Sequence, residues 1–160
     1  MQEILFEDNH IIIVNKKCGE IVQADKTGDA TLADKVKHYI KRKYHKPGKV
    51  FLGITHRLDR PTSGIVIFAK TGKALSRLNK MFAEQKIKKT YLAVIDRMPD
   101  EKNGSLNHVL IRNRKQNKSY AFDSHKKSSK EASLTYELIS ESDKFFLLEI
   151  QLHTGRHHQI

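Results

Sequence analysis

The chain has 160 residues, which is enough to bury one sizeable core and too few to make two ordinary domains the first expectation. Its 30 Lys and Arg residues outweigh its 18 Asp and Glu residues and give a net charge of +12, which favours nucleic acid as the partner over an anionic membrane or a basic surface that serves only solubility. The single cysteine, Cys18, excludes an internal disulfide and a zinc site built from several cysteines.

The first segments predict a hairpin. Residues 3–8 and 10–17 are rich in β-branched and apolar side chains and lie on either side of an Asp8-Asn9 turn. The apolar run 11–14 is too short for a signal peptide or a membrane-spanning helix, and acidic residues precede it. We therefore expect a cytoplasmic protein.

Two helices and a strand are predicted next. Residues 31–44 have an apolar residue at every fourth position with cations between them, which is typical of an amphipathic helix, and Pro47-Gly48 is expected to end it. The apolar positions are Leu32, Val36 and Ile40. Residues 63–70 read as a strand, and 71–86 follow helical spacing again.

The second half is predicted to be mostly strands. Residues 88–95 have a β-rich composition, whereas the basic stretch 112–120 lacks apolar periodicity and predicts an exposed loop or a loosely paired strand. Alternating apolar residues indicate antiparallel strands at 131–139 and 145–153, joined by a turn at 142–144. We expect one α+β domain with a mixed, mostly antiparallel β-sheet and flanking helices.

The segment HRLDRPTSG is the densest cluster of reactive side chains. Asp59 lies among three basic residues, His56, Arg57 and Arg60, directly before a predicted buried strand. Neighbouring cations keep a carboxylate ionised, and an ionised carboxylate can act as a nucleophile. Taken by itself, the segment favours a simpler role for Asp59, which is to cap a turn or pair with Arg57.

A second cluster, LHTGRHHQI, closes the sequence. Arg156 follows a Thr154-Gly155 turn and offers a planar fork for a carboxylate or a phosphate. Three histidines, His153, His157 and His158, raise the hypothesis of a metal site, but their spacing is not that of the HExxH helix and no acidic residue is near. A polar rim near bound RNA is the favoured interpretation.

HRLD followed by TSG, then KKTY and LHTGRHHQI, resembles in content and order the RluA-type family of RNA pseudouridine synthases. The resemblance starts at Asn15-Lys16 and covers nearly the whole chain. It implies that Asp59 is the catalytic nucleophile, that Tyr91 stacks on the flipped uracil, and that Arg156 pairs with the aspartate. It also implies that Arg57 is associated with flipping of the target base. We expect His56, Arg57, Arg60 and Thr62 to bind RNA.

The implied reaction isomerises a specific uridine in a stem-loop of rRNA or tRNA and needs no cofactor and no metal. We expect a monomer. The chain departs from the family pattern at Lys17, where proline is common, and at His157, where threonine is common. Family members also continue beyond the HQI sequence, so we expect a catalytic domain that spans 1–160, is truncated at its C-terminus and lacks an S4-like domain.

Two rival hypotheses remain open. The chain could be a non-catalytic RNA-binding module of the same fold, in which case it would bind RNA without forming a product. It could also be a metal-dependent nuclease built on the three histidines of the second cluster, in which case a chelator would abolish its activity.

Overall fold

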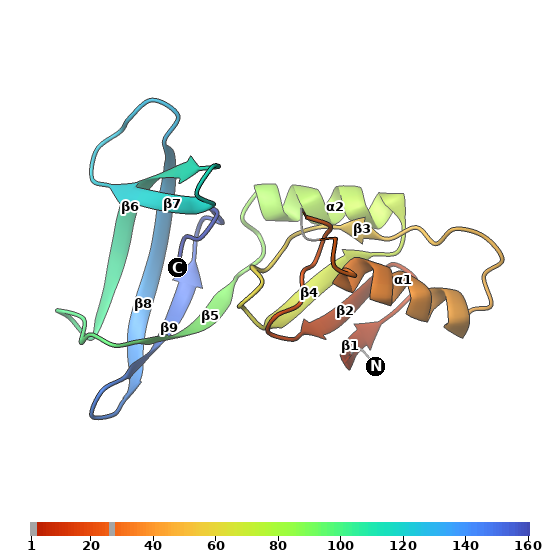
Figure 1. The fold of residues 1–160 in the computed structure, drawn as a ribbon, viewed down its shortest axis with the longest axis horizontal. Helices are drawn as coiled ribbons and strands as arrows, with labels where there is room; N and C mark the ends of the chain where they lie inside the picture. The colour runs from red at the N-terminus through yellow and green to blue at the C-terminus, as the bar shows by residue number, and fades with distance from the viewer. Residues whose placement is uncertain (1–2, 26–27) are drawn as a thin grey trace. The chain divides into compact units, whose positions relative to one another are not determined.

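A computed structural model describes residues 3–25 and 28–160 of the chain. The chain divides into two compact units, Met1–Glu84 and Gln85–Ile160, which we call unit 1 and unit 2. Each unit has its own antiparallel sheet, and both helices belong to unit 1 (Figure 1). The α+β fold class is therefore confirmed, with the strands shared between two sheets.

Unit 1 contains a four-stranded sheet in the order β1-β2-β4-β3, with every pair antiparallel. The strands are β1 (Glu3–Glu7), β2 (Ile11–Lys16), β3 (Gly53–Ile54) and β4 (Gly64–Ala69). The predicted hairpin is confirmed, because the Asp8 side chain accepts hydrogen bonds from the backbone N–H groups of His10 and Ile11 at 2.7 Å. The following strand, β3, has only two residues and was not predicted.

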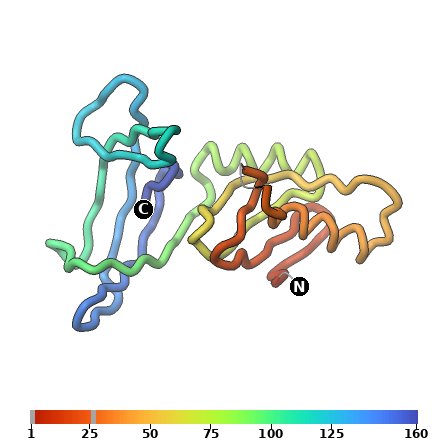
Figure 2. The backbone as a smooth tube through the Cα atoms, in the orientation of Figure 1, coloured from red at the N-terminus to blue at the C-terminus, as the bar shows by residue number. Residues whose placement is uncertain are grey.

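Helix α1 (Leu32–Lys43) covers the apolar face of this sheet, and its Thr31 side chain caps the first turn by accepting from the Asp34 N–H. The predicted apolar stripe of the helix joins four fully enclosed strand residues in one core. These are Ile12, Val14, Val66 and Phe68. The helix ends at Lys43, earlier than predicted, because His45 takes a left-handed conformation (φ 47°) ahead of Pro47. Figure 2 traces the long loop that then leads to β3.

Helix α2 (Gly72–Ala83) follows β4 as predicted and contacts β3 and β4. The Thr71 side chain caps it by accepting from the Ala74 N–H at 3.1 Å. Close approach of the helix explains Gly53, since a Cβ there would lie 2.9 Å from the methyl carbons of Leu75. In the described part of the chain, no helix is long and apolar enough to cross a membrane.

Unit 2 consists of a five-stranded antiparallel sheet in the order β5-β9-β8-β6-β7. The strands are β5 (Thr90–Ile95), β6 (Asn103–Asn113), β7 (Lys118–Phe122), β8 (Lys130–Glu141) and β9 (Phe146–Leu152). The alternation predicted for the last two strands is confirmed, because their apolar residues form one cluster with the inner face of β5. Its buried members are Leu134, Leu148, Ile150 and Leu152.

The basic stretch 112–120 corrects the prediction of a loop or loosely paired strand. It forms the end of a regular hairpin in which β6 pairs with β7 up to Asn113 and Lys118. The Asn113 side chain accepts from the Gln116 N–H at 3.1 Å, and Asn117 takes the left-handed conformation that closes the turn (φ 50°). Turn chemistry, which apolar periodicity does not detect, decides the structure here.

Candidate active site

In unit 1, Asp59 lies on the loop that connects β3 to β4. Its backbone carbonyl accepts a hydrogen bond from the Thr62 N–H at 3.0 Å, which makes a turn of residues 59–62. Asp59 and Arg57 are both exposed, so the carboxylate and the guanidinium are accessible to a large substrate. We call residues 55–63 the Asp59 loop.

A fully enclosed ammonium group at the end of β2 binds backbone carbonyls of the Asp59 loop. Lys16, at the end of β2, has an exposed fraction of 0%. Its Nζ donates to the carbonyl oxygens of Thr62 at 2.6 Å, Lys17 at 3.1 Å and Arg60 at 3.2 Å. A buried cation that is satisfied by carbonyls fixes the backbone around it, because moving it would break hydrogen bonds to a charged donor.

The electrostatics of Lys16 connect it to the candidate nucleophile. Burial lowers the pKa of Lys16, while the charges of Glu20 and Asp59 oppose that shift. Sequence reasoning missed this role. The available signal was the alternation of β2, which places Lys16 on the same buried face as Ile12 and Val14.

His56 anchors the start of the Asp59 loop. Its Nε2 accepts a hydrogen bond from the Ile67 N–H at 3.1 Å, and its ring lies 5.0 Å from the ring of Phe82 on α2. The neighbouring Thr55 hydroxyl donates to the Ile67 carbonyl at 2.6 Å. The histidine therefore fixes the loop against β4 and α2 in addition to any contact with RNA.

Arg60 is tied to acidic residues of unit 1. Its guanidinium donates to Asp29 at 2.7 Å and lies 3.8 Å from Asp25. Its carbonyl accepts from the Gly19 N–H at 2.8 Å as well as from Lys16. The backbone of Arg60 is thus well fixed, whereas its side chain is 42% exposed and its ion pairs are weak ones that phosphate can replace.

In unit 2, Tyr91 lies on β5 opposite Ile150 of β9. Its half-buried ring contacts the apolar cluster of this sheet. An aromatic ring of this kind has one face against apolar side chains and another part available to a ligand. The packing expected of an aromatic residue in a strand is therefore present, and it is compatible with stacking on a base.

Arg156 lies on the turn after β9, in the same unit. Its Nε donates to the Glu131 carbonyl at 2.7 Å, and its backbone N–H donates to Gln159 Oε1 at 2.9 Å. The Gln159 side chain also accepts from the Thr154 hydroxyl and donates to the Ser133 carbonyl. Gln159, which sequence reasoning did not single out, thus ties the Arg156 turn to β8. No carboxylate of residues 85–160 forms an ion pair with Arg156.

A cleft of about 510 Å³ lies in unit 2 near these residues. Its lining comes from the start of β5 and the segment before it, from the end of β9 and from one residue of β8: Gln85, Ile87, Lys88, Lys89, Thr90, Thr135, Gln151, Leu152 and His153. Burial, and then the charge of Arg156, lowers the pKa of Lys89. Polar groups and two close cations make this cleft suitable for an anionic or polar ligand.

The three histidines of the LHTGRHHQI segment do not assemble a metal site. His157 Nδ1 lies 3.0 Å from the Ser119 hydroxyl, and its ring stacks on His158 at 3.8 Å. Across residues 3–25 and 28–160, no group of three or more His, Cys, Asp or Glu side chains is arranged to hold a metal ion. The nuclease hypothesis therefore has no structural support.

The structure brings His56, Arg57, Asp59, Arg60 and Thr62 together on one loop of unit 1. Tyr91 and Arg156 both belong to unit 2. The pairing of Asp59 with Arg156 stays a prediction, and so do the catalytic and RNA-binding roles of all seven residues.

Comparison with known proteins gives one consistent result. Residues 10–160 match the family model described as RNA pseudouridylate synthase. An uncharacterized RNA pseudouridine synthase of Chlorobaculum parvum is 33% identical over 98% of this chain and 49% of its own length. The ribosomal large subunit pseudouridine synthase D of Zymomonas mobilis is 34% identical over 99% of this chain and 50% of its own. The chain thus spans about half the length of the curated relatives it matches.

Solved structures agree on the fold. The human RNA pseudouridylate synthase domain containing 4 superimposes with a TM-score of 0.82 at 21% identity, over 98% of this chain and 61% of that one. The human RNA pseudouridylate synthase domain containing 1 gives a TM-score of 0.78 at 22% identity, over 99% of this chain and 62% of that one.

Proposed function

Because the chain belongs to the RNA pseudouridylate synthase family, and within it to the RluA type, we propose that it contributes the catalytic machinery that isomerises a uridine in RNA to pseudouridine. One observation carries the proposal. The aspartate of the HRLD motif is exposed on a turn whose carbonyl groups are fixed by the fully enclosed Lys16. Such a turn presents a carboxylate to a macromolecule without letting its backbone move.

The reaction is balanced without a second substrate. The bond between N1 of uracil and C1′ of the ribose breaks, the base rotates, and a new bond joins C5 to C1′. C5 loses a proton and N1 gains one, so the product has the composition of the substrate. A carboxylate nucleophile can hold the intermediate covalently, and Asp59 can fill this role by attack at C1′ or at C6. No redox step occurs, and we propose that no cofactor takes part.

Access to the base explains the other proposed residues. A uridine inside folded RNA must leave its stack, which costs a few kcal/mol. Arg57 assists this extrusion from the exposed side of the Asp59 loop, and the half-buried ring of Tyr91 stacks on the extruded uracil. The pairing of Arg156 with Asp59 is proposed from the family's TGR element, which Thr154, Gly155 and Arg156 match.

RNA affinity comes from cations near the site and from the net charge of +12. His56, Arg57, Arg60 and Thr62 form the RNA-contacting edge of the Asp59 loop. The substrate is a stem-loop of ribosomal or transfer RNA, and the protein acts as a cytoplasmic monomer. We also propose that residues 1–160 work as one catalytic domain.

The test compares native protein with Asp59→Asn in the whole protein. Pseudouridines are mapped in total RNA from cells that lack the gene and are complemented with each form. The native gene should restore at least one pseudouridine, and Asp59→Asn should restore none, because an amide is a poor nucleophile. Asp143→Asn, at an exposed turn between β8 and β9, is the matched control and should restore the site.

A second variant tests the contribution of unit 2 independently of Asp59, which belongs to unit 1. Tyr91→Leu should lose most turnover while it keeps most of the apolar contact with Ile150. If Asp59→Asn still restores the pseudouridine, Asp59 is not the nucleophile. If native protein binds RNA but restores no modification anywhere, the chain is the non-catalytic RNA-binding module instead.

A further inference from the structure

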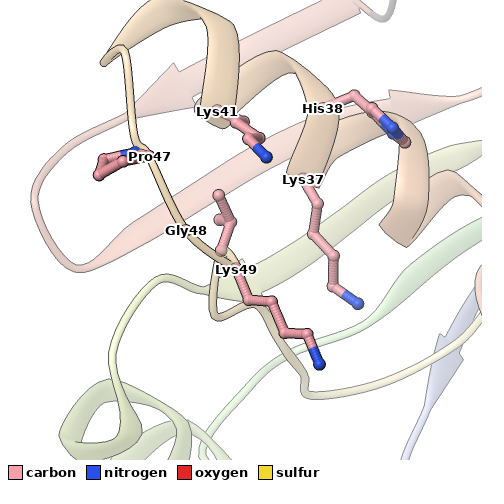
Figure 3. A pocket seen from close by; sticks show the side chains of 7 residues that line it. Lys37, His38, Lys41, Pro47, Gly48 and Lys49 are labelled. Carbon is pink, nitrogen blue, oxygen red and sulfur yellow. The ribbon is translucent and has the colours of Figure 1, made fainter.

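A second cationic surface lies in unit 1, outside the Asp59 loop. The later turns of α1 and the loop that follows the helix enclose a cleft of about 340 Å³, which we call the α1 basic cleft (Figure 3). Its lining residues are Lys37, His38, Lys41, Pro47, Gly48, Lys49 and Val50. Figure 3 shows the side chains of Lys37 and Lys49 extending in the same direction, one from the helix and the other from the loop.

The charge of this cleft is uncompensated. No Asp or Glu lines it. Within the described ranges, 3–25 and 28–160, Lys41 and Lys49 form no ion pair. Lys37 lies 3.9 Å from Asp34, and these side chains are 42% and 51% exposed, so this pair is weak. Three ammonium groups around one concave surface create a positive potential that attracts an anion.

Other lysines of the same helix show a different arrangement. Lys35 pairs with Glu20 at 2.7 Å, and Lys43 pairs with Glu7 at 2.7 Å. These two cations therefore serve to attach α1 to the rest of unit 1. The lysines of the α1 basic cleft do not attach the helix to the rest of unit 1 in this way.

The helix dipole does not account for the cleft either. Cations in the last turn of a helix are stabilised by its negative end, which suits Lys41. Lys37 lies more than a turn before the end of α1, and Lys49 lies outside the helix. Their convergence on one cleft therefore needs another explanation.

We propose that the α1 basic cleft binds the phosphodiester backbone of RNA through Lys37, Lys41 and Lys49, as a contact additional to the Asp59 loop. The choice of RNA as the ligand rests on the proposed function. Each ammonium group donates hydrogen bonds to phosphate oxygens, and a lysine makes this contact without reading the base. The cleft therefore supplies affinity and orientation, while choice of the uridine is left to other surfaces.

The experiment measures binding to a short RNA hairpin that contains no uridine. Such a probe cannot be a substrate, so its affinity reports backbone contacts and is independent of catalysis. The whole protein is compared with the triple variant Lys37→Gln, Lys41→Gln, Lys49→Gln. The matched control is Lys73→Gln, Lys127→Gln, Lys144→Gln, which removes the same charge from exposed lysines elsewhere.

The cleft variant should weaken hairpin binding about tenfold or more at about 0.1 M salt. The slope of log K against log salt, measured from about 50 to about 200 mM, should become shallower by about 2, since each phosphate contact contributes about 0.7 to 0.9. The control should change the dissociation constant much less. Thermal unfolding should be the same in all forms, because none of the substituted side chains is buried.

Three outcomes overturn the proposal: unchanged binding by the cleft variant, equal loss in the cleft and control variants, or preferential binding of the cleft to vesicles of anionic phospholipid over RNA. Asp59→Asn should bind the hairpin as the native protein does. The two proposals can fail separately. If the native protein makes no pseudouridine but the cleft variant still binds the hairpin more weakly than the native protein does, the proposed function is wrong and the assignment of the cleft stands.

Discussion

Among the described residues of unit 1, six apolar ones have an exposed fraction of 0%, whereas the most buried apolar residue of unit 2, Ile150, retains 4%. The six are Ile12, Val14, Leu32, Val66, Phe68 and Ala69. Helix α1 covers the core of unit 1, while residues 85–160, all of which are described, form no helix. Unit 1 therefore has an interior closed off from solvent, whereas the apolar face of the unit 2 sheet has no covering helix and every one of its apolar residues keeps some exposure.

The difference matters for the residues of the proposed site. An enclosed interior can hold a charged group in place, and in unit 1 it holds the ammonium group that fixes the Asp59 loop. A thinly covered sheet leaves side chains half exposed, as Tyr91 is in unit 2. We infer that unit 1 supplies a rigid nucleophile and unit 2 an accessible stacking surface.

Lys16→Met is expected to have the largest effect on the free energy of unfolding. It tests whether the buried ammonium group makes the Asp59 loop of unit 1 rigid. The variant removes three hydrogen bonds from a charged donor, and such bonds contribute about 1.5–3 kcal/mol each. Because the Arg60 and Lys17 carbonyls keep the N–H groups of Gly19 and Glu20 as donors, the free energy of unfolding should fall by about 3 kcal/mol. Urea unfolding measures the loss, and pseudouridine formation below the unfolding midpoint should also decline.

Lys17→Met is the matched control, since Lys17 is the adjacent and exposed residue. It should unfold like the native protein. If Lys16→Met were as stable as this control, the carbonyl groups of the Asp59 loop would not depend on the buried ammonium group, and unit 1 would owe its rigidity to the apolar core.

Glu7→Gln is expected to have the second-largest effect on the free energy of unfolding, and it tests how α1 is attached to the sheet of unit 1. The Glu7 side chain is 7% exposed. Burial by itself would raise the pKa of Glu7, but hydrogen bonds from two lysines and two tyrosines outweigh it and lower the pKa to about 2. The donors are Lys43, Lys70, Tyr44 and Tyr39.

Because the pKa of Glu7 is lower in the folded state, the stabilisation is complete above the ordinary value of 4.5 and is lost as pH falls toward about 2. It amounts to about 3 kcal/mol. Native protein and Glu7→Gln should therefore differ in urea unfolding at neutral pH and converge near pH 2. Glu141→Gln, at an exposed position, should follow the native curve, and a constant difference at every pH would contradict the assignment.

The sequence patterns predicted the long elements and missed the short or polar ones. Both helices and the first hairpin follow from apolar spacing and capping residues that lie within one segment. Strand β3 is two residues long, which is too short to show alternation, and β6 carries many polar residues on its exposed face. Pairing with neighbours distant in sequence, which local patterns do not contain, decides both strands.

The candidate site shows the same division. HRLD pointed to Asp59 because the chemistry lies within one motif, and the structure places those neighbours on one loop. Lys16 was predictable as a buried position, but two of the three carbonyls that it contacts, those of Arg60 and Thr62, come from a loop more than forty residues later. Gln159 acts across to β8, so its role also depended on tertiary structure.

Gln159→Leu is expected to have the smallest effect on stability, and it tests whether the unit 2 part of the site is held as firmly as the Asp59 loop. The variant removes the acceptor of the Arg156 N–H and of the Thr154 hydroxyl, and the donor to Ser133. Since these groups are partly exposed and water can replace the bonds, the free energy of unfolding should fall by about 1 kcal/mol or less.

Turnover should respond more than stability does, because the backbone of the Arg156 turn loses its tie to β8 and only the bond from Nε to the Glu131 carbonyl still positions the guanidinium. Gln159→Glu keeps the acceptor for the Arg156 N–H and should recover most of the lost kcat, with KM little changed. If the leucine variant lost kcat and stability in proportion, Gln159 would be a general support of unit 2. If the leucine variant lost kcat without losing stability, and Gln159→Glu restored kcat, Gln159 would act by positioning the Arg156 turn.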